Sequence, residues 1–191
     1  MGPTNLNPVT PVYPSQFTSP WRMKDGTEVT IRPVRAEDEP LMVKFHETLS
    51  DRTVYLRYFA SLSLSSRTAH ERLARICVSD YEHEMVLVAE YAEYRDRQTG
   101  ELHILGVGRF SKLRADREAE IAVVVSDPYQ HRGLGTELLR RLIHIARERK
   151  LCRIVAEMLR DNLAMQVIFR NLGFRLHLSG DSASVQAVLD L

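Results

Sequence analysis

A glycine-containing turn between an apolar strand and a long helix carries the residues best suited to chemistry in this sequence. The segment SDPYQHRGLGT (126–136) places Gly133 and Gly135 where the helix would begin. The first backbone N–H groups of a helix have no partner within it, and the helix dipole adds partial positive charge there. The turn therefore predicts an anion site suited to phosphate or pyrophosphate. A plain tight turn between strand and helix is the alternative.

The charge distribution favours the anion site. Residues 128–175 contain ten Lys and Arg against four Asp and Glu, whereas the whole chain of 191 residues has a net charge of +1. Such a local excess suits a polyanionic small ligand, although many of these residues would equally form a solvated helix face. Two other phosphate signatures do not match. Leu138 stands where a dinucleotide fingerprint needs a third glycine, and the Gly-Lys-Ser/Thr of a Walker loop is absent.

Composition places the chain among ordinary globular domains. With 44% apolar residues and balanced charge, it is neither a disordered tail nor a general polyanion binder. Cys77 and Cys152 lie among apolar residues without a CxxC pair, which favours a reduced intracellular chain with buried thiols and excludes a zinc ribbon. The seven histidines form no metal constellation, the basic residues lack an aromatic platform for nucleic acid, and no apolar run would span a bilayer. We expect a cytoplasmic protein with no metal, nucleic-acid partner or membrane attachment.

The elements that must position the turn form a mixed α/β domain. Residues 1–20 contain five of the eight prolines and predict a leader or linker, with one domain over 21–191 that begins near Trp21. The run 118–127 is apolar on both faces at its centre, which is typical of a mid-sheet strand. Strands are expected over 25–34, 84–91, 102–110, 118–127, 153–158, 174–179 and 184–191, and helices over 36–49, 53–59, 67–77 and 133–149. A last helix, capped by Asp161 and closed by Gly173, should carry Ala164, Ile168 and Leu172.

Two motifs resemble the signatures of the GNAT (GCN5-related N-acetyltransferase) superfamily. VSDPYQHRGLG (125–135) is similar to its acyl-CoA-binding motif, V-x(4)-Q/R-x-x-G-x-G/A, and DNLAMQVIFRNLGF (161–174) is similar to a second signature that ends in Gly-Phe. YPSQF, WRMKDGTEVTIRPVRAEDEPLMVKFHETLS and VYLRYF further resemble the acetyltransferase domain of bacterial protein lysine acetyltransferases fused to ADP-forming acyl-CoA synthetase domains. The superfamily pattern covers roughly residues 27–191. It implies the GNAT fold, a mixed and largely antiparallel sheet that is splayed at its middle and flanked by helices.

The resemblance also implies where the cosubstrate, acetyl-CoA, would bind. The backbone of Val123 and Val125 would pair with the acyl-pantetheine, although both valines would equally be plain strand core. Asn162 would hydrogen-bond the pantetheine or pyrophosphate region, or else serve as a second helix cap. The residues expected to hold the pyrophosphate, chiefly through backbone amides, are Gln130, His131, Arg132, Gly133, Leu134, Gly135 and Thr136.

Phe169 departs from the family pattern. Many members carry a tyrosine at this point of the last helix, where it protonates the leaving thiolate, and a phenyl ring cannot do so. The ring would pack on the pantetheine instead. Tyr129 and Tyr55 are candidate substitutes, and CoA thiolate leaves readily enough to need no dedicated acid.

Glu120 is the expected general base. The reaction would be attack of a neutral amine on the thioester carbonyl, and an amine of pKa about 10 is mostly protonated at pH 7. Glu120 matches the family's strand-borne glutamate and lies in an otherwise apolar stretch, where desolvation would raise its pKa. Glu118, on the same strand face, is the alternate base and would act through water. The competing interpretation of Glu120 is a strand-end carboxylate paired with Arg117 or Arg114.

The function implied by the resemblance is direct transfer of acetyl from acetyl-CoA to an amine. A protein lysine ε-amine is the preferred acceptor, with an acyl-CoA synthetase as a candidate partner. A small amine is the first alternative, which a deep acidic pocket would favour, whereas an open groove would favour a protein. A non-catalytic acyl-CoA sensor is the second alternative. Phe169 agrees with the sensor and Glu120 argues against it.

Overall fold

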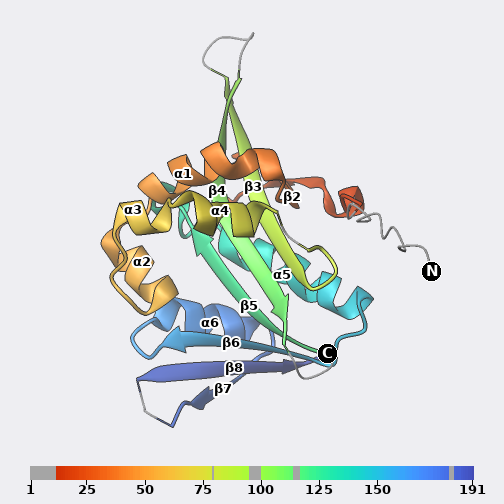
Figure 1. Ribbon diagram of the computed structural model, residues 1–191. Helices are drawn as coiled ribbons and strands as arrows, with labels where there is room; N and C mark the ends of the chain where they lie inside the picture. The colour runs from red at the N-terminus through yellow and green to blue at the C-terminus, as the bar shows by residue number, and fades with distance from the viewer. Residues whose placement is uncertain (1–11, 79, 95–99, 114–116, 181–182) are drawn as a thin grey trace, which may run out of the picture.

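One mixed sheet forms the centre of the molecule (Figure 1). The computed structural model describes residues 12–78, 80–94, 100–113, 117–180 and 183–191, and within them eight strands follow the order β1-β2-β3-β4-β5-β6-β8-β7. The strands are β1 Ser19–Arg22, β2 Glu28–Pro33, β3 Glu84–Tyr94, β4 Gly100–Lys112, β5 Glu118–Val125, β6 Arg153–Leu159, β7 Arg175–Leu178 and β8 Ser184–Asp190. Only β5 and β6 pair in parallel among these strands.

Helices cover both faces of the sheet. In Figure 1, α1 and α4 cross in front of the central strands, α2 and α3 lie at one side, and α5 runs behind. The helices are α1 Glu39–Glu47, α2 Asp51–Tyr58, α3 Leu64–Arg67, α4 His70–Cys77, α5 Leu134–Glu148 and α6 Leu163–Asn171, with 3-10 turns η1 Ser15–Phe17, η2 Ala36–Asp38 and η3 Asp127–Tyr129. The expected helix 67–77 begins three residues late, as α4, because Ala69 is extended just before it (ψ 130°), and residue 67 instead ends the short helix α3.

The sheet divides the apolar core into two layers. Along β3, Met85 and Leu87 pack in one cluster with α5, whereas Val86 and Val88 pack in another with α1 and α4. Successive strand residues point to opposite faces, so a strand covered on both sides must be apolar throughout. The expected stripe of α5 is buried, while Cys77 is buried and Cys152, against expectation, is exposed.

The sheet is splayed between β5 and β6. β5 pairs with β6 only over Glu118–Glu120, against Arg153–Val155, whereas its other edge pairs with β4 from Ala119 to Val125. From Ile121 onward, none of the described strands therefore pairs with the second edge of β5. The mixed, largely antiparallel and splayed sheet is the fold that the sequence predicted.

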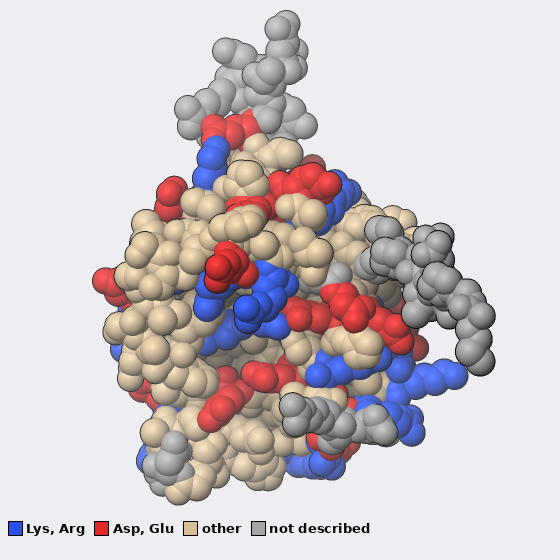
Figure 2. All heavy atoms as spheres, in the orientation of Figure 1, with Lys and Arg blue, Asp and Glu red and all other residues tan. Residues whose placement is uncertain are grey.

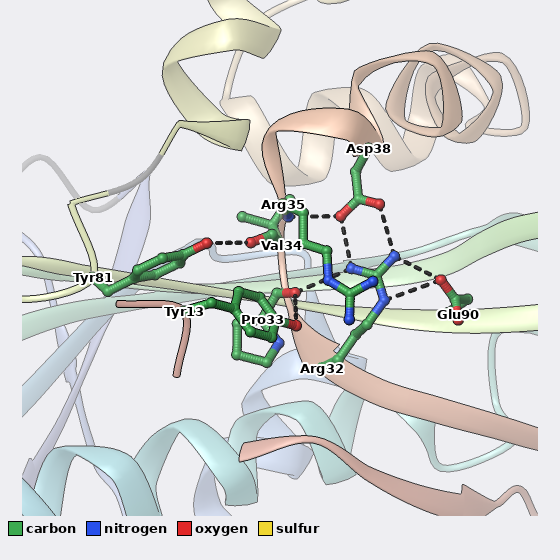
Figure 3. A network of polar contacts seen from close by, with 8 residues as sticks. All are labelled: Tyr13, Arg32, Pro33, Val34, Arg35, Asp38, Tyr81 and Glu90. Carbon is green, nitrogen blue, oxygen red and sulfur yellow. Dashed lines mark hydrogen bonds and ion pairs between the residues drawn. The ribbon is translucent and has the colours of Figure 1, made fainter. Parts of the chain in front are cut away.

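The segment before Trp21 belongs to the fold. η1 and β1 both begin before that residue, so the expected start of folded structure is several residues too late. Residues 1–11 of the predicted leader, and the 95–99 loop of the predicted hairpin, lie outside the described residues. The Tyr13 hydroxyl donates to the Pro33 carbonyl (3.0 Å), and its ring meets Tyr81 edge-on (Figure 3). These contacts attach the N-terminal segment to the end of β2.

A buried ion network lies beside this attachment (Figure 3). The guanidinium of Arg32 donates to both carboxylate oxygens of Asp38 (2.7 Å each) and to Glu90 (2.6–3.0 Å). Arg32 and Asp38 are almost wholly buried, so water cannot replace either partner. The network joins β2, η2 and β3, and it thereby fixes the start of α1 relative to the sheet.

Candidate active site

A cleft of about 500 Å³ opens where β5 and β6 separate. One side of α2, the loop before α5 and one side of α6 form its walls. Eleven of the twelve predicted site residues line it: Glu120, Val123, Val125, Gln130, His131, Gly133, Leu134, Gly135, Thr136, Asn162 and Phe169. The side chain of the twelfth, Arg132, turns away to pair with Asp25 and to donate to the Pro128 carbonyl (2.7 Å).

The loop before α5 presents unpaired backbone donors. Among the described residues, no backbone N–H from His131 to Thr136 donates to a protein acceptor, and the next one, of Glu137, donates to the Gly133 carbonyl (3.1 Å). The chain enters the helix through left-handed backbone at His131 (φ 60°) and Gly133 (φ 89°). Adjacent amides at the positive end of a helix form an anion site. The amide of Gln130 is the exception in the predicted set, because it donates to the Asp127 carbonyl (3.3 Å).

The open edge of β5 offers further backbone groups. The Ser126 amide donates to the Leu105 carbonyl on β4 (2.9 Å). Because backbone groups alternate between the two edges of a strand, those of Val125 and Val123 point away from β4, toward the cleft. One of them, the Val125 carbonyl, accepts from the Gln130 side chain (3.1 Å). The edge therefore suits a ligand that pairs with extended backbone, as amide groups of a pantetheine arm can.

Helix α2 is attached to both walls of the cleft. The Gln130 amide side chain also donates to the Thr53 hydroxyl (3.1 Å), and Arg52 pairs with Asp161 at the start of α6 (3.0 Å). Asp161 is therefore not the cap of α6. Asn162 is the cap, because its side-chain oxygen accepts from the Met165 amide (3.3 Å).

Two carboxylates face the acceptor side of the cleft. Glu120 is exposed there, so the apolar burial expected around it is wrong at this end of β5. It makes no ion pair with Arg117, whose guanidinium donates to the Lys150 carbonyl; Arg114 lies outside the described residues. Glu118 pairs with Arg153 at the strand start (3.3 Å). The second cleft carboxylate, Glu157 on β6, was not predicted.

The three residues considered for protonation of the leaving sulfur lie apart. Phe169 is buried and packs edge-on against Phe174, with ring centroids 4.8 Å apart. Tyr129 lines the cleft at the donor loop, close to the Arg132 guanidinium. Tyr55 is exposed and is not among the lining residues. Tyr129 is thus the only one of the three that brings a hydroxyl to the cleft.

Arg57 is the second cleft residue that sequence reasoning missed. It lies one residue before the end of α2, close to Glu120. Burial lowers its pKa, and repulsion from Arg109 and Arg72 lowers it further. Nothing in the sequence distinguishes it from the exposed basic residues of other helices. Its significance appears only when α2 is packed over β5.

Comparisons with known proteins agree with this geometry. A family model described as an acetyltransferase (GNAT) domain matches residues 28–175. The chain is 32% identical over 152 residues to "Acetyltransferase PA5475" of Pseudomonas aeruginosa, covering 80% of this chain and 77% of that protein. The solved GNAT domain of S. lividans PAT aligns with a TM-score of 0.80 and 26% identity over 94% of this chain and 99% of that one. Mycobacterium smegmatis RimJ, solved with CoA-disulfide, shares the fold with a TM-score of 0.67 at 18% identity, covering 91% and 86%.

A splayed sheet, a helix-start anion site and an open strand edge define an acyl-CoA-dependent transferase. The chain belongs to the GNAT acetyltransferase family, and its cosubstrate is acetyl-CoA. Within the described residues there is no cluster of metal-ligating side chains and no helix long and apolar enough to cross a membrane.

Proposed function

We propose that the protein transfers the acetyl group of acetyl-CoA directly to a protein lysine ε-amine, with Glu120 as general base. One observation carries the proposal. The exposed carboxylate of Glu120 shares a single cleft with the unpaired amides of the donor loop. One ligand bound along the edge of β5 would thus extend from the amides to the carboxylate.

The chain's own groups suggest the course of the reaction. The amides of residues 131–136 hold the pyrophosphate, and the backbone of Val123 and Val125 holds the pantetheine. The ring of Phe169 packs against the pantetheine. Glu120 accepts a proton as the amine nitrogen attacks the thioester carbonyl. The C–N bond forms, the C–S bond breaks, and its electron pair leaves on sulfur. A thiol has a pKa of only about 8.5, so CoA can leave as the thiolate without a tyrosine donor.

Two features support a protein lysine as the acceptor. The cleft is open on the face drawn in Figure 2, where a hollow lies between basic side chains above and acidic side chains below. An open face suits an acceptor presented on another protein, and the carboxylates of Glu120 and Glu157 attract a cationic amine. The S. lividans PAT domain also matches nearly the whole chain. An acyl-CoA synthetase is the candidate acceptor protein.

Release of free thiol from acetyl-CoA tests the proposal. The acceptors are a lysine-bearing acyl-CoA synthetase and a panel of small amines, and the variants are Glu120→Gln and the matched Glu118→Gln. Loss of a general base lowers turnover by about 10²–10⁴-fold. We expect this loss for Glu120→Gln, with acetyl-CoA still bound, and little change for Glu118→Gln, since Glu118 is paired with Arg153.

The other outcomes identify the alternatives. If only Glu118→Gln loses turnover, the general base is Glu118 and not Glu120. If one small amine is acetylated and the synthetase is not, the acceptor is that small amine and not a protein lysine. If the protein binds acetyl-CoA but acetylates none of these acceptors, the non-catalytic acyl-CoA sensor becomes the favoured interpretation.

A further inference from the structure

A second, smaller cavity adjoins the cleft on the acceptor side of the sheet. Its volume is about 50 Å³, and it lies between the sheet and helices α1, α2 and α4. Arg57, Ala122 and Val124 line both the cavity and the cleft, so the two spaces meet along β5. A substituent a few bonds long could therefore extend into the cavity from a thioester held along β5.

Basic side chains surround this cavity. Arg57, Arg72, Arg109 and His46 all line it, and the remaining lining residues are apolar or aromatic. Burial, followed by the charges of three arginines, lowers the pKa of His46 to about 4, so its imidazole is neutral at pH 7. Within the described residues, Arg109 is the only one of these basic side chains with a carboxylate partner, Glu84 (2.9 Å).

Arg57 and Arg72 lack a hydrogen-bonded anion. Neither guanidinium makes an ion pair or side-chain hydrogen bond to the described chain, and the Nε of Arg72 is fully buried without a partner. Both guanidinium carbons lie about 5 Å from the ring of Tyr58, at 5.0 and 4.9 Å. Glu120 attracts Arg57 without forming an ion pair with it.

This arrangement is costly without an anion. Arg57 and Arg72 are half-buried, and because a guanidinium cannot lose its proton in a protein, both charges persist there. Like charges around one small cavity repel, whereas a carboxylate would accept two parallel N–H bonds from a guanidinium fork. A carboxylate also fits a cavity of this size.

We propose that Arg57 and Arg72 form a carboxylate-binding subsite beside the reacting thioester, so that the enzyme takes a substrate bearing a carboxylate near its reacting atom. The inference rests on the acyl transfer proposed above and goes beyond it, because neither the acetyl group nor a lysine ε-amine carries a carboxylate: the subsite adds a donor or an amine that does. The carboxylate belongs either to the acyl chain of the donor, as in malonyl- or succinyl-CoA, or to the amine acceptor. In both cases the amine attacks the thioester carbonyl, the C–S bond breaks, and the carboxylate takes no part in bond making.

A comparison of two acyl-CoA donors, one with and one without a carboxylate, tests whether the carboxylate belongs to the acyl chain. The dissociation constants of acetyl-CoA and succinyl-CoA are measured by calorimetry for the wild type, Arg57→Leu, Arg72→Leu and the control Arg75→Gln. Arg75 is an exposed residue of the same helix as Arg72 and does not line the cavity. A hydrogen bond to a charged group typically changes a dissociation constant by a factor of about ten or more. We expect the preference for succinyl-CoA to fall by that factor in both leucine variants and to persist in Arg75→Gln.

Paired acceptors test the second source. L-Lysine and 1,5-diaminopentane differ by one carboxylate, and their kcat/KM values with acetyl-CoA are compared in the same variants. A fall of about tenfold in the lysine preference on loss of Arg57 or Arg72 assigns the carboxylate to the acceptor. Arg57→Lys, which keeps the charge without the planar fork, should restore part of either preference.

The outcomes separate the inference from the function on which it rests. If acetyl-CoA binds and reacts but neither preference changes in the leucine variants, the carboxylate subsite is refuted and the transferase is not. If both donors weaken equally, together with a lower midpoint of thermal unfolding, the arginines are structural and the subsite is also refuted. If the wild type binds no acyl-CoA, the proposed function fails and the subsite fails with it.

Discussion

Gly133→Ala would isolate the backbone geometry of the donor loop. Gly133 has φ 89°, and a Cβ added there would meet only Lys24 and Trp21, at 3.5 Å and 3.6 Å, which is ordinary contact. The substitution therefore adds strain without a steric clash. Left-handed backbone costs an L-residue roughly 1–2 kcal/mol. For a domain of this size each kcal/mol lowers the unfolding midpoint by about 2–4 °C, so we expect a fall of about 2–8 °C.

Gly135→Ala is the matched substitution two residues further on. Gly135 lies inside α5, and a Cβ there would be 3.5 Å from Val125 Cγ2, at the wall of the cleft. Alanine favours a helix over glycine by up to about 1 kcal/mol, so stability should be kept or increased. The added methyl would instead obstruct the approach of a pyrophosphate to the amides. We expect acetyl-CoA to bind about tenfold more weakly, the effect of losing one hydrogen bond to a charged group.

Thermal unfolding followed by circular dichroism, together with calorimetric titration of acetyl-CoA, measures both effects. An unchanged unfolding midpoint in Gly133→Ala would refute the strain argument. An unchanged affinity in Gly135→Ala would show that the start of α5 does not hold the pyrophosphate.

Two further predictions concern buried charge. Because the pKa of His46 is about 4 in the folded chain and 6.5 in the reference state, the unfolded chain binds a proton first as the pH falls. The free energy of unfolding should therefore decrease between pH 6.5 and pH 4, by up to about 3 kcal/mol from this residue, and urea titrations of His46→Gln should show a shallower decrease. Asp38→Asn leaves the buried Arg32 without its two-fold partner and should cost about 3 kcal/mol or more, measured by urea unfolding. Its control is Glu28→Gln, which breaks an exposed pair and should cost less than about 1 kcal/mol; equal losses would contradict the burial argument.

Long periodic segments and turn chemistry made most of the fold predictable. The apolar run of β5, the stripe of α5 and the glycines between them are local patterns with strong physical causes. The segment before Trp21 was misjudged because proline density indicates a linker. Its place in the fold depends on tertiary contacts, namely Tyr13 with Pro33 and Tyr81, which no local pattern records.

The donor half of the candidate site was predictable, whereas of the acceptor half only Glu120 was predicted. Backbone amides follow from the position of Gly133 in the chain, so a motif suffices to find them. Arg57 and Glu157 become cleft residues only because α2 packs over β5 and because β6 diverges from it. Glu120, which its apolar neighbours in sequence had suggested was buried, is the last residue of β5 that pairs with β6, and it is exposed at the cleft.

Helix α2 has a consequence for how mutants of this protein are interpreted. Thr53, near its start, contacts the donor loop through Gln130, and Arg57, near its end, lines the acceptor side. One short helix thus borders both the donor loop and the part of the cleft where we propose that the acceptor binds. A substitution anywhere along it can alter donor affinity and acceptor turnover together, so sequence position alone cannot assign its effect to either. Separate measurement of donor dissociation constants and acceptor kcat/KM is required for every α2 variant.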